Sequence, residues 1–341
     1  MDCVGSKLHA RTVSQRHDAT ACHGDRLPRG VYQFASPRDD ENTGSGLAPL
    51  TLACISGNVQ VVRDLIRSHG VNMNVRVLVD DLNTDFGCER GNGALGMAAF
   101  SCPYQHVHEI VSILLESGAD PNARTHVSGG TPLMGAVIGQ SVEAVRAWLA
   151  CERLDLEIGL KINNAAALNI AGVKGTYAIL EALLCAGADR LHRNDNGGFL
   201  LTDIAHNPIS DPTWFELACA TSMEDINAVR RPRNLKWKTT GFVMRTIFRL
   251  RISRSDLVMD QAHVNGCTPL SCAARVGNVK VVRWLLNNGT LKPLHSKTKN
   301  GRSPLDLSRM FGPHREVSLC YRASVCKRSP PLSSCSFAGG G

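Results

Sequence analysis

The 341-residue sequence is short of the features that mark membrane and secreted proteins. It contains no uncharged apolar run of about 18 residues, the length that a transmembrane helix needs. The first residues include Asp2, Lys7, His9 and Arg11, with no apolar segment behind them of the kind found in a secretion signal. Aromatic residues make up only 5% of the chain. We therefore expect a globular protein of the cytoplasm or the nucleus.

Motifs of the common enzyme classes are also missing. The chain has no Gly-x-Gly-x-x-Gly after a strand, no Walker loop, no Gly-x-Ser-x-Gly and no His-Glu-x-x-His. Scattered Cys and His residues do not supply the third, orienting group that nucleophilic catalysis requires. These absences predict a protein that is not an enzyme and has neither a cofactor nor a small-molecule substrate.

The 13 cysteines form neither a disulfide framework nor a metal motif. Their number is odd and their spacing does not repeat, which favours reduced thiols. Cys102, His106 and His108 come closest to a zinc site, but the set lacks a fourth ligand, so we expect no metal. Three cysteines fall where a helix calls for a small apolar side chain: Cys54, Cys185 and Cys272.

Positive charge is concentrated in one segment. The formal net charge is +8, yet residues 230–254 alone contain nine Lys or Arg and no acid, which leaves the rest of the chain near −1. The excess therefore belongs to a local element, and attraction of the whole protein to nucleic acid is not implied.

An internal repeat is the strongest signal in the sequence, and its clearest copy is 265–289. Thr268 can cap a helix, Pro269 suits the first helical position, and Gly277 suits the end of that helix. A second helix then follows, with an apolar face made of Val281, Val282, Leu285 and Leu286. The pattern predicts a pair of short helices in each repeat.

The leucine that follows Pro269 marks the phase of the repeat. Equivalent leucines are separated by 45, 38, 35, 33, 69 and 35 residues, and we interpret the interval of 69 as two periods and the 45 and 38 as single repeats with insertions. The ending of the second helix recurs at 114–122 and 183–189. The marker leucines are Leu50, Leu95, Leu133, Leu168, Leu201, Leu270 and Leu305.

This pattern resembles the ankyrin repeat over residues 46–312. The resemblance implies an all-α solenoid of stacked helix-turn-helix units with β-turn fingers, about six to seven repeats in all, some of them degenerate. The family's His after Thr-Pro-Leu is absent from every copy, so the hydrogen bonds that it makes between repeats are not expected here. In its place stand Thr51, Gly96, Met134, Asn169, Thr202, Ser271 and Asp306.

The pattern divides the chain into five segments. The polar N-terminal segment and the C-terminal tail show no sustained apolar period, which predicts disorder. The loop insertion at about 75–92 is either a tolerated surface insertion or a partner contact. The predicted segments are 1–45, disordered; 46–205, repeats 1 to 5; 206–262, a degenerate repeat with a basic insert; 263–312, the C-terminal repeats; and 313–341, a disordered tail.

The resemblance also implies a function, that of a scaffold or adaptor whose concave face binds a protein partner. In the family, the partner is contacted by the finger tips and by two residues near the end of each first helix. Ile55, Ile138 and Val173 would then form an exposed apolar strip, unless a slight shift of register buries them. The positions carried over are Ile55, Ser56, Val127, Ser128, Ile138, Gly139, Val173, Lys174, Asp195, Asn196, Val264, Asn265, Arg275, Val276, Lys299, Asn300 and Arg302.

A basic amphipathic helix is predicted over residues 235–250. Trp237, Val243, Met244, Ile247, Phe248 and Leu250 share one broad face, opposite Lys238, Arg245 and Arg249. Its apolar face could pack on the solenoid, fill a calmodulin-like groove or lie on an anionic membrane, and nucleic acid is a further alternative. Gly241 and Arg251 weaken the pattern. An alternative is that the chain is the ankyrin module of a larger signalling or channel protein, with residues 230–255 as an element that binds calmodulin or anionic membrane. The basic insert consists of Arg230, Arg231, Arg233, Lys236, Trp237, Lys238, Arg245 and Arg249.

Overall fold

The structure is a computed structural model that describes most of the repeat region. The predicted disordered segment 1–45 and the loop insertion 75–92 lie outside the described residues, as do Val264 and Arg251. The described residues are 49–69, 71, 74, 93–101, 104–219, 224–250, 252, 255, 262–263, 265–288, 297–312 and 314–328.

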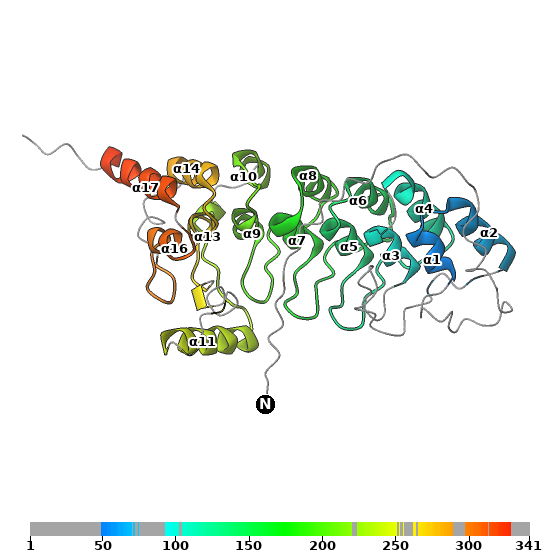
Figure 1. The fold of residues 1–341 in the computed structure, drawn as a ribbon, viewed down its shortest axis with the longest axis horizontal. Helices are drawn as coiled ribbons and strands as arrows, with labels where there is room; N and C mark the ends of the chain where they lie inside the picture. Colours follow the sequence, from blue (N-terminus) through cyan, green and yellow to red (C-terminus); the bar gives the residue numbers. More distant parts are fainter. Residues whose placement is uncertain are drawn as a thin grey trace, which may run out of the picture. The chain divides into compact units, whose positions relative to one another are not determined.

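Two rows of helices make up most of the described part of the chain, and each helix of one row packs against a partner in the other (Figure 1). The first row holds α1 (Pro49–Ile55), α3 (Ala94–Ser101), α5 (Pro132–Ile138), α7 (Ala167–Lys174), α9 (Leu200–His206), α13 (Pro269–Val276) and α16 (Pro304–Met310). The second row holds α2 (Val59–His69), α4 (Tyr104–Glu116), α6 (Val142–Leu149), α8 (Tyr177–Cys185), α10 (Pro212–Ala218), α14 (Val279–Asn288) and α17 (Arg315–Arg328). This arrangement confirms the all-α solenoid and its stacked helix pairs.

Caps and proline positions explain where the first helices begin. The Thr268 hydroxyl accepts a hydrogen bond from the Ser271 amide at 3.3 Å, and Ser303 accepts one from Asp306 at 3.2 Å. Each cap is followed by a proline at the first helical position. α7 begins at an alanine instead, and there the Asn169 side chain accepts from the Ala166 amide at 3.1 Å. This bond satisfies the amide of the N-cap residue, while the capping bond that a Thr or Ser side chain would make at this position is absent.

The core lies between the two rows, and the marker leucines are part of it. All of them except Leu305 are at most 4% exposed, and Leu305 is half-buried. Trp148 and Phe215 are the largest fully buried side chains. Small residues such as Ala171 are fully buried in the first row, where they allow neighbouring helices to approach closely. The period in the sequence is therefore the period of the core.

A finger loop precedes each of four first helices, α5, α7, α9 and α16, and is closed by a backbone hydrogen bond. The donor and acceptor lie four or five residues apart, as in Asn194 N to Gly198 O at 3.0 Å and Thr298 N to Arg302 O at 2.9 Å. In the finger before α13, the amide of Arg230 donates to the carbonyl of Cys267 at 2.8 Å. The residues between these two include α11 (Leu235–Arg249), so the basic helix is inserted into the tip of one finger.

This insertion corrects the interpretation of the 69-residue interval. α9 packs directly against α13, with no additional helix pair between them. The interval is therefore one repeat with a large insertion rather than two periods. Within the predicted segment 206–262, α10 is the second helix of the fifth repeat, which is followed by the 3-10 helix η1 (Glu224–Asn227) and by α11.

The predicted disordered tail is wrong for residues 315–328, which form α17. Val317 and Tyr321 are buried, and the helix packs on α14 and α16. The apolar residues of this segment are too few to suggest a helical period. A helix at the end of the second row has only one neighbouring repeat to cover, so it needs few of them. α17 therefore covers that end of the core.

Two glycines at equivalent finger positions provide a test of how the insertion packs. Gly197 and Gly301 both have positive φ, at 83° and 74°. A Cβ on Gly197 would collide with the backbone of Arg231, whereas one on Gly301 would meet nothing within 4 Å. We expect Gly301→Ala to lower the free energy of unfolding by about 1 kcal/mol through φ alone, and Gly197→Ala to lower it by at least about 2 kcal/mol more. Urea unfolding of both variants measures this, and equal losses would contradict the packing of Arg231 on the finger.

Candidate functional site

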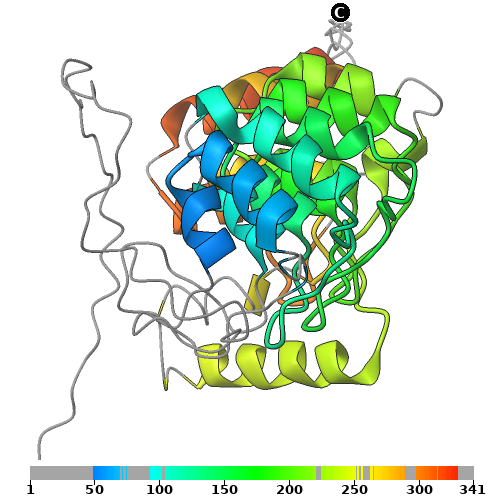
Figure 2. The same cartoon turned by 90° about the vertical axis from the view of Figure 1, so that its right-hand side faces the viewer.

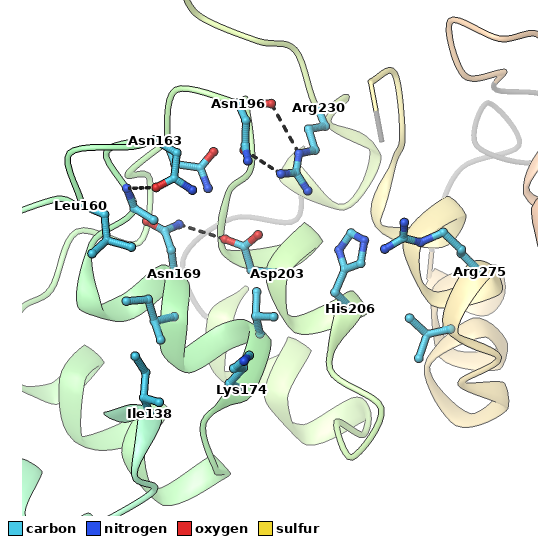
Figure 3. Close-up of a pocket in the computed structure, with 15 residues that line it drawn as sticks. Ile138, Leu160, Asn163, Asn169, Lys174, Asn196, Asp203, His206, Arg230 and Arg275 are labelled. Carbon is cyan, nitrogen blue, oxygen red and sulfur yellow. Dashed lines mark hydrogen bonds between the residues drawn. The ribbon is translucent and has the colours of Figure 1, made fainter. Parts of the chain in front are cut away.

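A pocket of about 560 Å³ opens on the finger side of the first-row helices (Figure 3). Its walls come from helices α5, α7, α9 and α13 and from the fingers beside them. The lining residues are Ile138, Leu160, Asn163, Ala165, Asn169, Ile170, Val173, Lys174, Asn194, Asn196, Asp203, His206, Arg230, Arg275 and Val276. Seven of these are among the contact and basic-insert positions predicted from the sequence: Ile138, Val173, Lys174, Asn196, Arg230, Arg275 and Val276.

One side of the pocket is apolar and open to solvent. Ile138 at the end of α5 is 46% exposed and Val173 on α7 is 37% exposed. Both therefore hold the exposed positions that the sequence predicts. Ile55 does not, because it is only 8% exposed and packs against Met97 and Leu52. The apolar strip thus begins at α5, and its prediction at Ile55 is wrong.

The other side of the pocket carries two arginines. Arg230 is 7% exposed, and its guanidinium donates to the side-chain oxygen of Asn196 at 2.6 Å. Arg275 stands over the ring of Phe311, 5.2 Å from the centroid. Burial and the neighbouring Arg230 lower the pKa of Arg275 to about 10, which still leaves it charged at neutral pH. The two cations therefore persist in a partly desolvated setting.

A buried carboxyl lies between the two sides. Asp203 is 3% exposed, and burial raises its pKa to about 6, against the opposing influence of Arg230 and of a hydrogen bond from Asn169 at 2.9 Å. Asn169 occupies the position of the family's His and reaches into the next repeat. A hydrogen bond between repeats is thus present here, although the missing His had suggested that it would be lost.

His206 contributes a neutral ring. Its pKa is lowered well below 6.5, mainly by burial and then by the charges of Arg275 and Arg230. Its Nδ1 lies 2.7 Å from the carbonyl oxygen of Thr202, so this nitrogen carries the proton and donates it. Nε2 is then an acceptor. Sequence reasoning missed Asp203 and His206 because neither belongs to a motif, and the stacking of α9 between α7 and α13 places them in the pocket.

The remaining predicted contact positions lie outside the pocket, in varied surroundings. Val127 is 66% exposed at a finger tip, and Asn265 is only 5% exposed. The Arg249 side chain donates to the Asn300 side chain at 3.0 Å. Val264 is not described. Ser56, Lys299 and Arg302 are exposed, and Ser128, Gly139 and Asp195 are half-buried. Their part in binding stays a prediction.

α11 crosses the finger tips rather than packing into the core (Figure 2). The indole nitrogen of Trp237 donates to the carbonyl of Ile162 at 3.3 Å, and the Phe248 ring meets His263 edge to face with centroids 4.8 Å apart. Burial lowers the pKa of His263 to about 4. A Cβ on Gly241 would collide with Asn265, so this glycine permits a close approach. The predicted apolar face is divided, because Trp237, Met244, Ile247 and Phe248 are half-buried while Val243 and Leu250 point to solvent.

The other basic-insert residues differ in burial. Arg231, Arg233, Lys236, Lys238 and Arg249 are exposed, and Arg245 is half-buried. No helix in the described part of the chain combines the length and apolar character needed to cross a bilayer.

Glu157, Asp189 and His192 are the one group of described residues that comes close to metal-ligand geometry. The two ring nitrogens of His192 are already engaged, one 3.3 Å from Glu157 and the other 2.8 Å from the Asn164 carbonyl. Glu157 also accepts from the Asp189 amide at 2.8 Å. The group therefore joins neighbouring fingers. Of the zinc candidates in the sequence, Cys102 lies outside the described residues.

Comparisons with known proteins agree with this geometry. A family model described as ankyrin repeats (3 copies) matches residues 20–125 and 95–194, and one described as ankyrin repeat matches 265–299. The first match begins N-terminal to the first repeat predicted from Leu50. No curated protein matches the sequence.

Two solved structures are similar. The ankyrin repeat domain of Bcl-3, described as a unique member of the IkappaB protein family, is 19% identical with a TM-score of 0.51, and the match covers 81% of this chain and 99% of that one. The human ASB11 ankyrin repeat domain is 22% identical with a TM-score of 0.49, over 83% and 99%. At these identities the likeness concerns the fold alone.

The buried carboxyl predicts an unusual dependence of stability on pH. The pKa of Asp203 is about 6 in the folded chain against an ordinary 3.8, so its contribution to stability is full below 3.8 and is lost as pH rises through 6. Asp203→Asn keeps an acceptor for Asn169 and does not titrate. We expect the stability of this variant relative to wild type to rise by about 2 kcal/mol between pH 4.5 and 7.5. Urea unfolding at both pH values measures it, and a constant difference would contradict the raised pKa.

Proposed function

This chain belongs to the ankyrin-repeat family, whose repeats are generally protein-protein interaction modules, and we propose that it is a non-enzymatic scaffold or adaptor that binds a protein partner in the pocket. The observation that carries the proposal is the composition of the pocket. Exposed apolar side chains of α5 and α7 face two partly desolvated arginines across one concave surface.

The chemistry of the two sides suggests the kind of segment that binds. An apolar side chain of the partner would remove Ile138 and Val173 from water, which stabilises a complex in proportion to the area buried. A carboxylate one or two residues away would meet Arg230 and Arg275, both of which are charged at neutral pH. The preferred partner is therefore a protein segment in which acidic and apolar residues lie close together.

The pocket volume is consistent with this assignment. About 560 Å³ falls within the range of pockets that enclose a small ligand, so a few side chains of a partner segment fit within it. We place the protein in the cytoplasm or the nucleus, where ankyrin modules would meet such partners. The chain could also act as the ankyrin module of a larger signalling or channel protein, with the same binding surface.

The apolar side of the pocket gives the first test. Ile138→Asp and Val173→Asp each place a charge where an apolar contact is expected, so both should abolish partner capture in quantitative affinity mass spectrometry. Circular dichroism should be unchanged, because both side chains are exposed. Ile209→Asp is a matched control, since Ile209 is 61% exposed and does not line the pocket. Loss of the same proteins in all three variants, or in none, would contradict the proposal.

The positive charge of the pocket gives a second, independent test. Lys174 lines the pocket and is exposed, so Lys174→Glu should not disturb the core. Opposite charge at this position should weaken binding of an acidic segment by about fivefold to tenfold at low salt, and the difference should shrink at 0.5 M salt as screening increases. Titration calorimetry with a captured partner measures both values. Unchanged affinity at low salt would show that the bound segment is not acidic.

A further inference from the structure

α11 has one side committed to the solenoid. It is tied to fingers of different repeats through Trp237 on Ile162 and through Arg249 on Asn300, and Gly241 lies against Asn265 between them. The helix therefore lies flat across several finger tips. Both cartoon views show it as the outermost element on that side of the described repeats (Figures 1 and 2).

The opposite side presents apolar residues to solvent. Leu235 is 74% exposed, Phe242 65%, Val243 48% and Leu250 66%. At 100° per residue, these four fall within an arc of roughly 100°, and we call this arc the outer face of α11. Large side chains at this exposure on one helix face are a patch for which the described chain provides no cover.

Two threonines share the outer face without adding free polar groups. The Thr239 hydroxyl donates to the Leu235 and Lys236 carbonyls at 3.0 and 2.8 Å, and that of Thr246 donates to the Phe242 carbonyl at 3.0 Å. Because these hydroxyls bond within the helix, covering them with an apolar phase costs less than covering unsatisfied ones. The outer face is thus more apolar than its composition suggests.

Cations flank the outer face on both sides. Lys236 lies at one edge and Lys238 at the other, and both are exposed; Arg249 lies beside Lys238 and is exposed, but its side chain donates to Asn300. Residues 230–254 contain no Asp or Glu. A stripe of apolar side chains with a lysine on each side complements a surface that is apolar inside and anionic outside, which is the interface of a bilayer that contains anionic lipid.

The side of α11 that is held against the fingers is not available to a partner. A flat partner surface is therefore favoured over a groove that encloses the helix. A calmodulin-like groove takes up the apolar face of a helix through large anchors at helical spacing, and two such side chains of α11, Trp237 and Phe248, are already held against the fingers. A planar surface needs only the outer face. We propose that the outer face of α11 binds peripherally to anionic membrane, with Leu235, Phe242, Val243 and Leu250 in the interface and the flanking cations on the headgroups.

Vesicle co-sedimentation of the full chain tests this proposal. Phosphatidylcholine vesicles with 30% phosphatidylserine are expected to bind it, because the flanking cations meet anionic headgroups, and pure phosphatidylcholine vesicles should bind at least tenfold less. Phe242→Asp and Leu250→Asp should each lower binding by about tenfold or more. Leu191→Asp is the matched control, because Leu191 is 65% exposed outside α11. Equal binding by all three variants would overturn the proposal.

The charge and the depth of binding are separate readouts. Lys236→Glu combined with Lys238→Glu should abolish the preference for phosphatidylserine. Phe242→Trp should show a blue-shifted emission on vesicles and quenching by brominated lipid, because the side chain enters the interface. The proposal would be overturned if the chain did not bind anionic vesicles. It would also be overturned if calmodulin, in the presence of calcium, bound the chain and the vesicles did not. Capture of a protein partner by the pocket is measured without vesicles. The proposed protein binding and the proposed membrane binding can therefore fail independently of each other.

Discussion

The ladder of backbone hydrogen bonds that joins consecutive fingers is the constraint on which the rest of the structure depends. Lys161 N donates to Ser128 O at 2.8 Å, Asp195 N to Asn163 O at 2.7 Å and Lys299 N to Asn265 O at 3.1 Å. Each repeat contacts only its neighbours, so these bonds and the helix packing carry the register along the array. The insertion of α11 is tolerated because the two ends of the interrupted finger keep the ladder, with Arg233 N bonded to Asp195 O at 2.9 Å on one side and Lys299 N bonded to Asn265 O on the other.

The hydrogen bonds of the interrupted finger also bring a charged side chain, that of Arg230, into the pocket. Arg230 closes the widened finger through its backbone and lines the pocket with its side chain. The pocket therefore holds partly desolvated cations beside a buried carboxyl whose pKa is raised to about 6. Burial of these groups opposes folding, and a bound anionic group would offset part of that cost. The residues that link the two proposed surfaces are thus 230–233, one end of which lines the pocket while the other leads into α11.

Most of the fold could be predicted from the sequence, and the candidate site only in part. Ile138, Val173 and Arg275 follow from alignment to the repeat, because a repeated backbone puts equivalent positions on the same face. Ile55 failed because its neighbour Met97 covers it, which no periodicity encodes. α17 was missed because an end helix needs few apolar residues.

The sequence by itself determined the helix pairs, their capping and their core, because these depend on contacts within a repeat and between neighbouring repeats that follow the same pattern. Only the tertiary structure decided that α11 interrupts a finger and that Asp203 and His206 share a pocket with Arg230. Those relations join residues far apart in the chain, through a backbone hydrogen bond between Arg230 and Cys267 and through the stacking of α9 between α7 and α13. Backbone bonds carry no side-chain signature, so no pattern of residue types could reveal them.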